Sequence, residues 1–312
     1  MSNLLMHWQG SKYRLADKLN SVLNVTHDIY VEPFMGSGGL FLNREITGAK
    51  EVINDLDAGV YSLWKTLAGN RYREFTKTFC NIPLDYKHFY NYKLQKDSGY
   101  PDNNEFQKAL IIYYLTVYSF NGDMKSQRYR NKPEMHKDME NAAKSRLMET
   151  VGNAHIRAAN ATILNENALN IVKEYRDEPN ALLYLDPPYV YDLMGDRKDL
   201  YNIKFQTSEQ EAMLEMITDA KAKICISGYR GGSLLYDGYL NKDSGWHTYS
   251  LGEFTRSAGM YRAEKGDPHN KAQEFVWTNY VLPQTASYCV NTVDFALDRR
   301  EIELYLKYVK TA

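Results

Sequence analysis

Four consecutive residues, Asp186, Pro187, Pro188 and Tyr189, combine groups that can bind a polar aromatic substrate. A carboxylate accepts hydrogen bonds, and a tyrosine ring offers a flat face with a polar tip. Each proline removes a backbone donor and fixes its own φ, so a strand ladder stops there and the backbone becomes rigid. The apolar run "ALLYL" directly precedes them. The sequence therefore predicts that a buried strand presents this tetrapeptide at its carboxyl end.

This tetrapeptide suits an exocyclic amino group conjugated to an aromatic ring, as in adenine. The lone pair of such a nitrogen is delocalised, and its two N–H bonds need two acceptors. The Asp186 carboxylate and the Pro187 carbonyl supply one each, which pulls the nitrogen toward tetrahedral geometry, while Pro188 fixes the backbone and Tyr189 stacks on the base. Such a site acts by positioning and charge stabilisation, without a metal or a covalent intermediate. A rigid turn with Asp as its polar residue is the alternative.

A second stretch, "VEPFMGSGG", places glycines between an apolar strand and an expected helix start at "LFLNREI". Without β-carbons at Gly36, Gly38 and Gly39, a ligand can lie close to the backbone. The spacing departs from G-x-G-x-x-G, which disfavours a nicotinamide cofactor. Asp55 ends the next strand, about 20 residues on, where a carboxylate can accept hydrogen bonds from ribose hydroxyls. These features predict a nucleoside-containing cofactor; a structural turn and an Asp55 that caps the following helix are the alternatives.

Alternating strand and helix patterns predict an α/β fold with a doubly wound parallel sheet. Strand patterns pause between about residues 60 and 160, where the segments become longer, more polar and helix-like. We therefore expect a discontinuous core domain at 1–59 and 160–290, a mostly helical insertion at 60–159 and a C-terminal appendage at 291–312. Ligands of such sheets bind at the carboxyl ends of the strands, near the switch point. Both motifs are expected to end strands, so they are expected to face one cleft.

The bulk composition excludes several classes of protein. The net charge of −1 over 312 residues argues against a protein that coats nucleic acid indiscriminately. The 26 tyrosines suit either stacking on ligands or amphipathic packing. Cys80, Cys225 and Cys289 lie far apart, so neither a disulfide framework nor a zinc site is expected. No membrane segment or signal peptide is evident, which predicts a cytoplasmic protein.

One segment, "FNGDMKSQRYRNKPEMHK", gathers basic side chains interleaved with Tyr and amide residues. A charge run of this kind is usually a solvated surface, so by itself it indicates little. The net charge of −1 does not exclude such a local basic face.

The two motifs together, "EPFMGSGG" at 32–39 and "DPPY" at 186–189, resemble the Dam-like family of S-adenosylmethionine-dependent DNA adenine N6-methyltransferases in its alpha-type motif order. In that order the cofactor motif precedes the target-recognition insertion and the catalytic motif follows it. "HWQGSKYRLADKL" resembles the family's opening Trp-x-Gly-x-Lys element, and "NDLD", "SFNG", "ICISGY" and "EFVWTNY" resemble further elements. Two departures occur. "FNG" is followed by "DMKSQRYR" instead of an aromatic residue and Arg, and Asn167 stands where the family usually has Asp, with Glu166 a less favoured substitute.

The resemblance implies a Rossmann-like methyltransferase sheet with an inserted, mostly helical target-recognition domain. It also implies methyl transfer from S-adenosylmethionine to N6 of an adenine flipped out of a specific site in double-stranded DNA. No metal or membrane partner is implied, and no oligomeric state is indicated. The implied catalytic residues are Asp186, Pro187, Pro188 and Tyr189. The implied cofactor-binding residues are Trp8, Gly10, Lys12, Glu32, Pro33, Phe34, Gly36, Gly38, Gly39, Asp55, Asn167 and Asp186. The implied DNA-binding residues are Asn121, Lys125, Gln127, Arg128, Tyr129, Arg130 and Lys132.

Other functions remain alternatives on the sequence alone. A cytosine N4-methyltransferase uses the same cofactor and geometry, but such enzymes more often carry Ser than Asp at the first catalytic position. An RNA target is an alternative, although no RNA-binding module is evident. A catalytically silent cofactor-binding DNA reader is disfavoured by the intact tetrapeptide at 186–189. A restriction nuclease needs a further signature, and "PDNNEFQK" at 101–108 is too compressed to serve.

Overall fold

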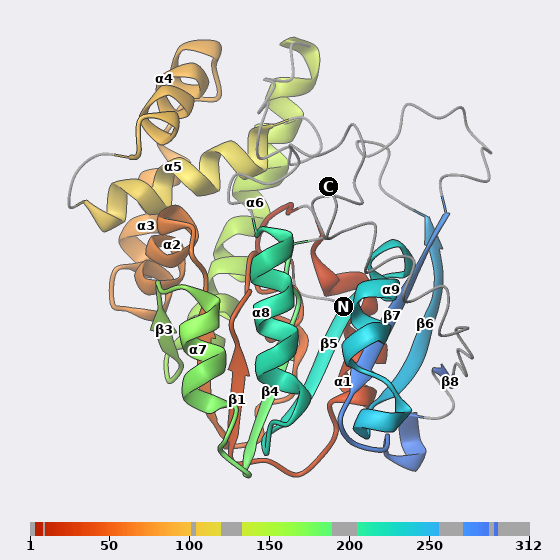
Figure 1. The fold of residues 1–312 in the computed structure, drawn as a ribbon. Helices are drawn as coiled ribbons and strands as arrows, with labels where there is room; N and C mark the ends of the chain where they lie inside the picture. The colour runs from red at the N-terminus through yellow and green to blue at the C-terminus, as the bar shows by residue number, and fades with distance from the viewer. Residues whose placement is uncertain are drawn as a thin grey trace.

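The fold is described by a computed structural model, which covers residues 4–8, 10–100, 104–119, 133–188, 205–255, 271–286 and 290–292. Its described strands form one sheet in the order β3-β2-β1-β4-β5-β7-β6-β8 (Figure 1). The pairs from β3 to β5 are parallel, and β7, β6 and β8 add antiparallel pairs at the other edge. The strand order reverses between β1 and β4. The predicted α/β class and doubly wound, Rossmann-like sheet are therefore confirmed.

Each strand covers part of a segment that the sequence pattern predicted, or extends the antiparallel edge. The strand bounds are β1 Ile29–Glu32, β2 Lys50–Asn54, β3 Thr162–Leu164, β4 Ala181–Leu185, β5 Lys223–Tyr229, β6 His247–Thr255, β7 Lys271–Thr278 and β8 Asn291–Thr292.

Strand β4 is buried along its whole length because helices cover both faces of the sheet. Leu182 and Tyr184 pack on the face covered by α1 (Ala16–Val22). Leu183 and Leu185 point to the opposite face, since successive side chains of a strand alternate. That second face is covered by α7, α8 and α9 (Figure 1). The bounds of these helices are α7 Ala168–Tyr175, α8 Thr207–Thr218 and α9 Arg230–Tyr239.

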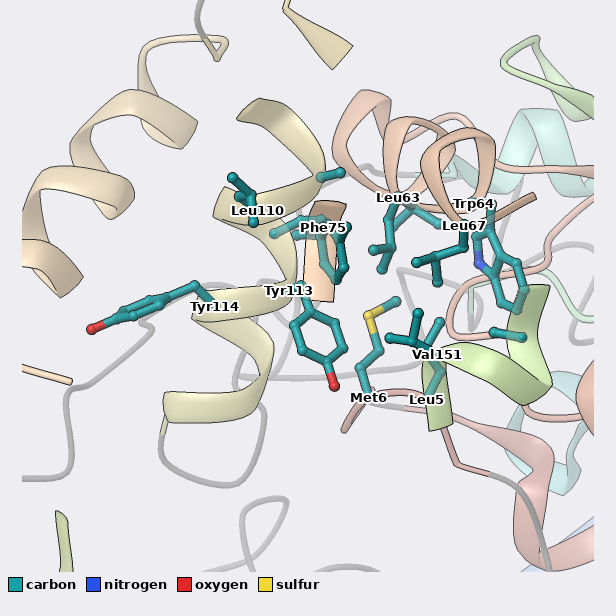
Figure 2. Packing of buried hydrophobic residues seen from close by; sticks show 14 of the residues in the cluster. Leu5, Met6, Leu63, Trp64, Leu67, Phe75, Leu110, Tyr113, Tyr114 and Val151 are labelled. Atoms are coloured by element: carbon teal, nitrogen blue, oxygen red, sulfur yellow. The ribbon is translucent and has the colours of Figure 1, made fainter. Parts of the chain in front are cut away.

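Between β2 and β3 the described chain is helical, as the pattern predicted. The helices are α2 Ala58–Ala68, α3 Tyr72–Cys80, α4 Tyr86–Asp97, α5 Glu105–Tyr118 and α6 Pro133–Ala158. Their apolar faces share one core with the chain's N-terminal segment, and Figure 2 shows Leu5 and Met6 beside Tyr113 of α5 and Val151 of α6. The Thr116 hydroxyl also lies 3.6 Å from the Met6 sulfur. The N-terminal segment is thus anchored in the helical core before it reaches the sheet.

The prediction that a helix starts at "LFLNREI" is wrong. The chain forms only a short 3₁₀ turn, η2 (Phe41–Asn43), and then becomes extended at Arg44. Residues 40–42 are all buried, whereas a surface α-helix turns one of three consecutive side chains toward solvent. The Phe41 carbonyl accepts a hydrogen bond from Nε of Arg157 on α6. Tertiary packing therefore replaces the local helix.

Among the described helices, none is long and apolar enough to cross a bilayer.

Candidate active site

The two predicted motifs meet at one edge of the sheet. The glycine turn follows β1 and Asp186 follows β4, and these strands are parallel neighbours, with Ile29 opposite Ala181 and Val31 opposite Leu183. The strand order reverses between them, which is where open α/β sheets bind ligands. The expected common location of the two motifs is therefore supported by the sheet register.

Asp186 is held through one carboxylate oxygen. Its Oδ1 accepts hydrogen bonds from Nζ of Lys12 at 2.6 Å and from the Ser227 hydroxyl at 3.0 Å. The Tyr184 hydroxyl lies 2.9 Å from the Ser227 hydroxyl. Serine has one proton and donates it to the carboxylate, so Tyr184 must donate to Ser227. Among the described residues no hydrogen bond reaches Oδ2, and the side chain keeps 18% of its surface exposed.

Lys12 is buried against two carboxylates, with 5% of its side chain exposed. Besides Asp186, its Nζ donates to the Gly10 carbonyl at 3.1 Å and lies 3.5 Å from Oε1 of Glu274 on β7. Burial raises the pKa of Glu274 to about 7; the Lys12 charge opposes this rise and the Asp186 charge adds to it. Lys12, predicted as a cofactor residue, therefore lies against the predicted catalytic carboxylate.

Glu32 adds a third buried carboxylate to this part of the sheet. It accepts a hydrogen bond from the Tyr30 hydroxyl at 2.9 Å. Burial raises its pKa to about 8, and the Asp186 charge adds to this rise while Tyr30 and Arg44 oppose it. Glu32 is therefore mainly protonated at neutral pH, so the negative charge beside Lys12 comes from Asp186 and Glu274.

The space beside the turn glycines is filled by protein side chains. A β-carbon on Gly36 would lie 2.8 Å from Nε1 of Trp8, and one on Gly38 would lie 2.4 Å from the Trp64 ring. Both glycines also have positive φ, of 54° and 66°. Similarly, a β-carbon on Gly39 would meet the Ser11 hydroxyl at 2.4 Å. The turn therefore needs glycine for its own packing, whatever it binds.

Asp55 ties the end of β2 to this turn. Its Oδ2 accepts from the Gly36 amide at 2.7 Å and its Oδ1 from the Asp57 amide at 2.8 Å. Burial raises the pKa of Asp55 to about 7, with a further rise from the Asp57 charge. Asp57, not Asp55, caps α2, because its carboxylate accepts from the amides of Gly59 and Val60. The alternative interpretation of Asp55 as the helix cap is therefore wrong.

The remaining predicted cofactor residues lie at neighbouring strand ends. The Asn54 side chain donates to the carbonyls of Pro33 and Glu166, which links the ends of β1, β2 and β3. Asn167 uses its side-chain oxygen to cap α7 through the Leu169 amide, and its side chain is exposed. Phe34 meets Phe205 edge to face at 5.3 Å between ring centroids. Asn54 and Asn167 thus lie toward β2 and β3, whereas Phe34 packs in the core cluster that contains Leu183 and Leu185 of β4.

Gln210 was not predicted, although it fixes the proline segment. It is fully buried on α8, its Nε2 donates to the Pro188 carbonyl at 2.6 Å, and its Oε1 accepts from the Tyr236 hydroxyl at 2.9 Å. A sequence signal exists, because Gln210 interrupts the apolar stripe of α8 formed by Met213, Leu214 and Ile217. Ser227 on β5 and Glu274 on β7 also escaped prediction.

Some predicted residues lie outside the described part of the chain. They are Tyr189 and the DNA-binding candidates Asn121, Lys125, Gln127, Arg128, Tyr129, Arg130 and Lys132. Cys225 is buried, and burial raises the pKa of its thiol. Within the described residues, no group of three or more His, Cys, Asp or Glu side chains is arranged to hold a metal ion.

Comparison with known proteins identifies related sequences. The family described as D12 class N6 adenine-specific DNA methyltransferase matches residues 8–242. A DNA adenine methylase of Haemophilus influenzae is 25% identical over 191 residues, which cover 59% of this chain and 63% of that protein, less than two thirds. Type II methyltransferase M1.LlaDCHI of Lactococcus lactis subsp. cremoris is 23% identical over 287 residues, covering 88% and 94%. A DNA adenine methylase of Escherichia coli is 23% identical over 219 residues, covering 69% and 74%.

Gly38→Ala tests whether packing and backbone together require glycine in the turn. Gly48→Ala is the matched control, since Gly48 also has positive φ, of 84°, but no atom lies within 4 Å of its added β-carbon. We expect Gly48→Ala to cost about 1 kcal/mol from backbone strain alone. Gly38→Ala should cost about 1–3 kcal/mol more, because the Trp64 ring must move. Urea unfolding measures both changes, and equal costs would contradict the contact with Trp64.

Glu32→Gln tests the raised pKa of this carboxyl group. Between its ordinary pKa of 4.5 and its folded pKa of about 8, the folded protein holds a proton that the unfolded chain has released. Wild-type stability from Glu32 therefore falls as pH rises through this window. Relative to wild type, Glu32→Gln should gain on the order of a few kcal/mol in unfolding free energy from pH 5 to pH 8. Glu74→Gln, at an exposed site, is the control: its unfolding free energy in urea should change with pH as that of the wild type does. If the unfolding free energy of Glu32→Gln also changed with pH as in the wild type, the raised pKa of Glu32 would be refuted.

Proposed function

This chain belongs to the D12 class of N6 adenine-specific DNA methyltransferases, and from that premise we propose that it methylates N6 of an adenine flipped out of a specific site in double-stranded DNA, with S-adenosylmethionine as the methyl donor. Its membership confirms the predicted family, a methyl-transferring enzyme that acts on adenine in DNA. We propose three points beyond the family match: the identity of the methyl donor, base flipping and the roles of single residues.

The position of Asp186 carries this proposal. Its Oδ1 is engaged by Lys12 and Ser227, and no described hydrogen bond reaches Oδ2. We assign Oδ2 and the Pro187 carbonyl as acceptors for the two N–H bonds of the adenine amino group. Gln210 supports the second acceptor, because it fixes the adjoining Pro188 carbonyl. Two fixed acceptors orient the nitrogen and its lone pair toward the methyl carbon.

The charge of the site fits the donor. S-adenosylmethionine supplies a methyl group on a positively charged sulfonium. Asp186 and Glu274 both lie against the single ammonium of Lys12, so a bound sulfonium would share their negative charge. Negative charge also stabilises the positive charge that develops on the adenine nitrogen. Asp186 thus serves as an acceptor and as a source of electrostatic stabilisation.

The other half of the donor would lie along the ends of β1, β2 and β3. Each Asp55 oxygen accepts one described backbone donor, and a carboxylate oxygen can accept more than one hydrogen bond. We therefore assign the remaining capacity to ribose hydroxyls. Asn167 uses its oxygen as a helix cap, and its amide N–H groups can donate to an adenine ring nitrogen. Trp8, Gly10, Pro33, Phe34 and the turn glycines complete the proposed cofactor site.

DNA is proposed to bind across the helical insertion at 60–159, with the sheet at 1–59 and 160–290 as the catalytic domain and 291–312 as an appendage. The basic residues at 121–132 are assigned to phosphates and base edges, because Arg pairs well with guanine and Asn or Gln with adenine. Flipping the adenine costs a few kcal/mol of stacking and pairing. Protein–DNA contacts and stacking on Tyr189 are proposed to offset that cost.

Unmodified DNA and labelled S-adenosylmethionine provide the direct test. After incubation the DNA is digested to nucleosides and the labelled base is identified. The proposal predicts label in N6-methyladenine. Label in N4-methylcytosine would replace adenine with cytosine as the target, and cofactor binding without transfer would indicate a silent reader.

Asp186→Asn tests the catalytic carboxylate with little change in shape. The amide can still occupy the Oδ1 position, but it lacks the charge that stabilises the developing cation. We expect methyl transfer to fall about 100-fold or more, with donor affinity within several-fold of wild type. Asp186→Ala should abolish transfer. Asp219→Asn, which loses a surface ion pair with Arg176, is the control and should keep wild-type activity. A normal rate in Asp186→Asn would show that this carboxylate is not catalytic.

A further inference from the structure

We infer that Tyr184, Ser227 and Glu274 are positioning residues for Asp186, acting with Lys12 to hold its Oδ1 and present Oδ2 to the adenine amino group. This inference rests on the proposed function. It gives a role to residues for which the sequence predicted none, and it distinguishes the two oxygens of the catalytic carboxylate by role.

The hydroxyl chain from β4 to β5 has a single direction. Tyr184 donates to Ser227, and Ser227 donates to Oδ1 of Asp186, over 2.9 Å and 3.0 Å. Both hydroxyl-bearing residues are buried on adjacent central strands, where their side chains have little freedom. Burial also raises the pKa of Tyr184 well above its ordinary value, so this phenol stays protonated as a donor. The chain therefore fixes the rotation of the carboxylate.

Glu274 acts on Asp186 through Lys12. It is 1% exposed, and its Oε1 has no hydrogen bond among the described residues although Nζ of Lys12 lies 3.5 Å away. A buried carboxylate oxygen without a hydrogen bond is costly and calls for a specific reason. Two carboxylates share one ammonium here, so Lys12 orients Asp186 without fully neutralising it. Asp186 thereby keeps negative potential for the adenine nitrogen.

Two hydroxyl deletions test the chain from Tyr184. We expect Ser227→Ala to lower kcat about 10-fold, with KM for DNA and for the donor within about threefold of wild type, because orientation is lost but binding surfaces remain. Tyr184→Phe should lower kcat less. Because Tyr184 acts only through Ser227, the double variant should match Ser227→Ala instead of multiplying the two effects.

Matched control variants and a measurement of folding distinguish a loss of positioning at Asp186 from a loss of stability. Ser250→Ala and Tyr280→Phe each remove a hydroxyl that bonds elsewhere and should keep the wild-type kcat. Donor binding and thermal melting report whether each variant is folded. If Ser227→Ala does not fold, Tyr184→Phe provides the test of the hydroxyl chain. The inference would be overturned if Ser227→Ala and Tyr184→Phe both kept the wild-type kcat, or if their effects on kcat multiplied in the double variant. Absence of transfer by the wild type would instead overturn the proposed function.

Glu274→Gln tests the second arm through a pH profile. Among the described side chains, the titratable groups that face Glu274 are Lys12, Asp186, Tyr184 and Tyr236, and burial keeps both tyrosines neutral by raising their pKa values. When Glu274 is protonated, Lys12 pairs with Asp186 alone and neutralises its charge more fully. Wild-type kcat should therefore decline as pH falls through about 7. Glu274→Gln should already have the lower kcat at pH 8, so its kcat should show no decline near pH 7. Glu51→Gln, which removes a partly buried carboxylate paired with Arg157, should keep this change in kcat near pH 7. An unchanged profile in Glu274→Gln would exclude this role.

Discussion

The buried contact between Lys12 and Asp186 is the interaction on which the described site depends. Removing two charges from water is costly, and a buried pair is tolerated only when its geometry and remaining hydrogen bonds are satisfied. Here the Gly10 carbonyl, Ser227 and Glu274 complete the surroundings of the pair. These partners come from the N-terminal segment, β5 and β7, so the pair requires these elements to be assembled beside β4.

The same contact joins the two parts of the molecule. Met6 packs in the helical core with α5 and α6, and only a short segment separates it from Lys12 at the catalytic carboxylate. Trp8, on that segment, covers Gly36 of the turn, and Trp64 of α2 covers Gly38. Through these packing contacts, the helical core that is proposed to read DNA directly supports the ends of β1 and β4.

The buried carboxylates place a stability cost at the site. Glu32, Asp55 and Glu274 all have pKa values raised by burial, so each resists ionisation in the folded protein. A sulfonium ligand would relieve part of that cost by supplying positive charge. Function, not stability, is therefore the better account of why acidic groups converge at these strand ends.

The family, the α/β class, the helical insertion and the places of Asp186 and the glycine turn could all be predicted from the sequence, because rigid prolines, glycine spacing and buried strand patterns are local signals. Only the tertiary structure shows that Lys12 lies on Asp186 and that Ser227, Gln210 and Glu274 support the site. It also replaced the expected helix after residue 40 with a 3₁₀ turn. Those outcomes depend on strand order and on partners more than 20 residues apart, such as Arg157 with Phe41 at a separation of 116 residues. A local pattern cannot specify which distant side chain will satisfy a buried polar group.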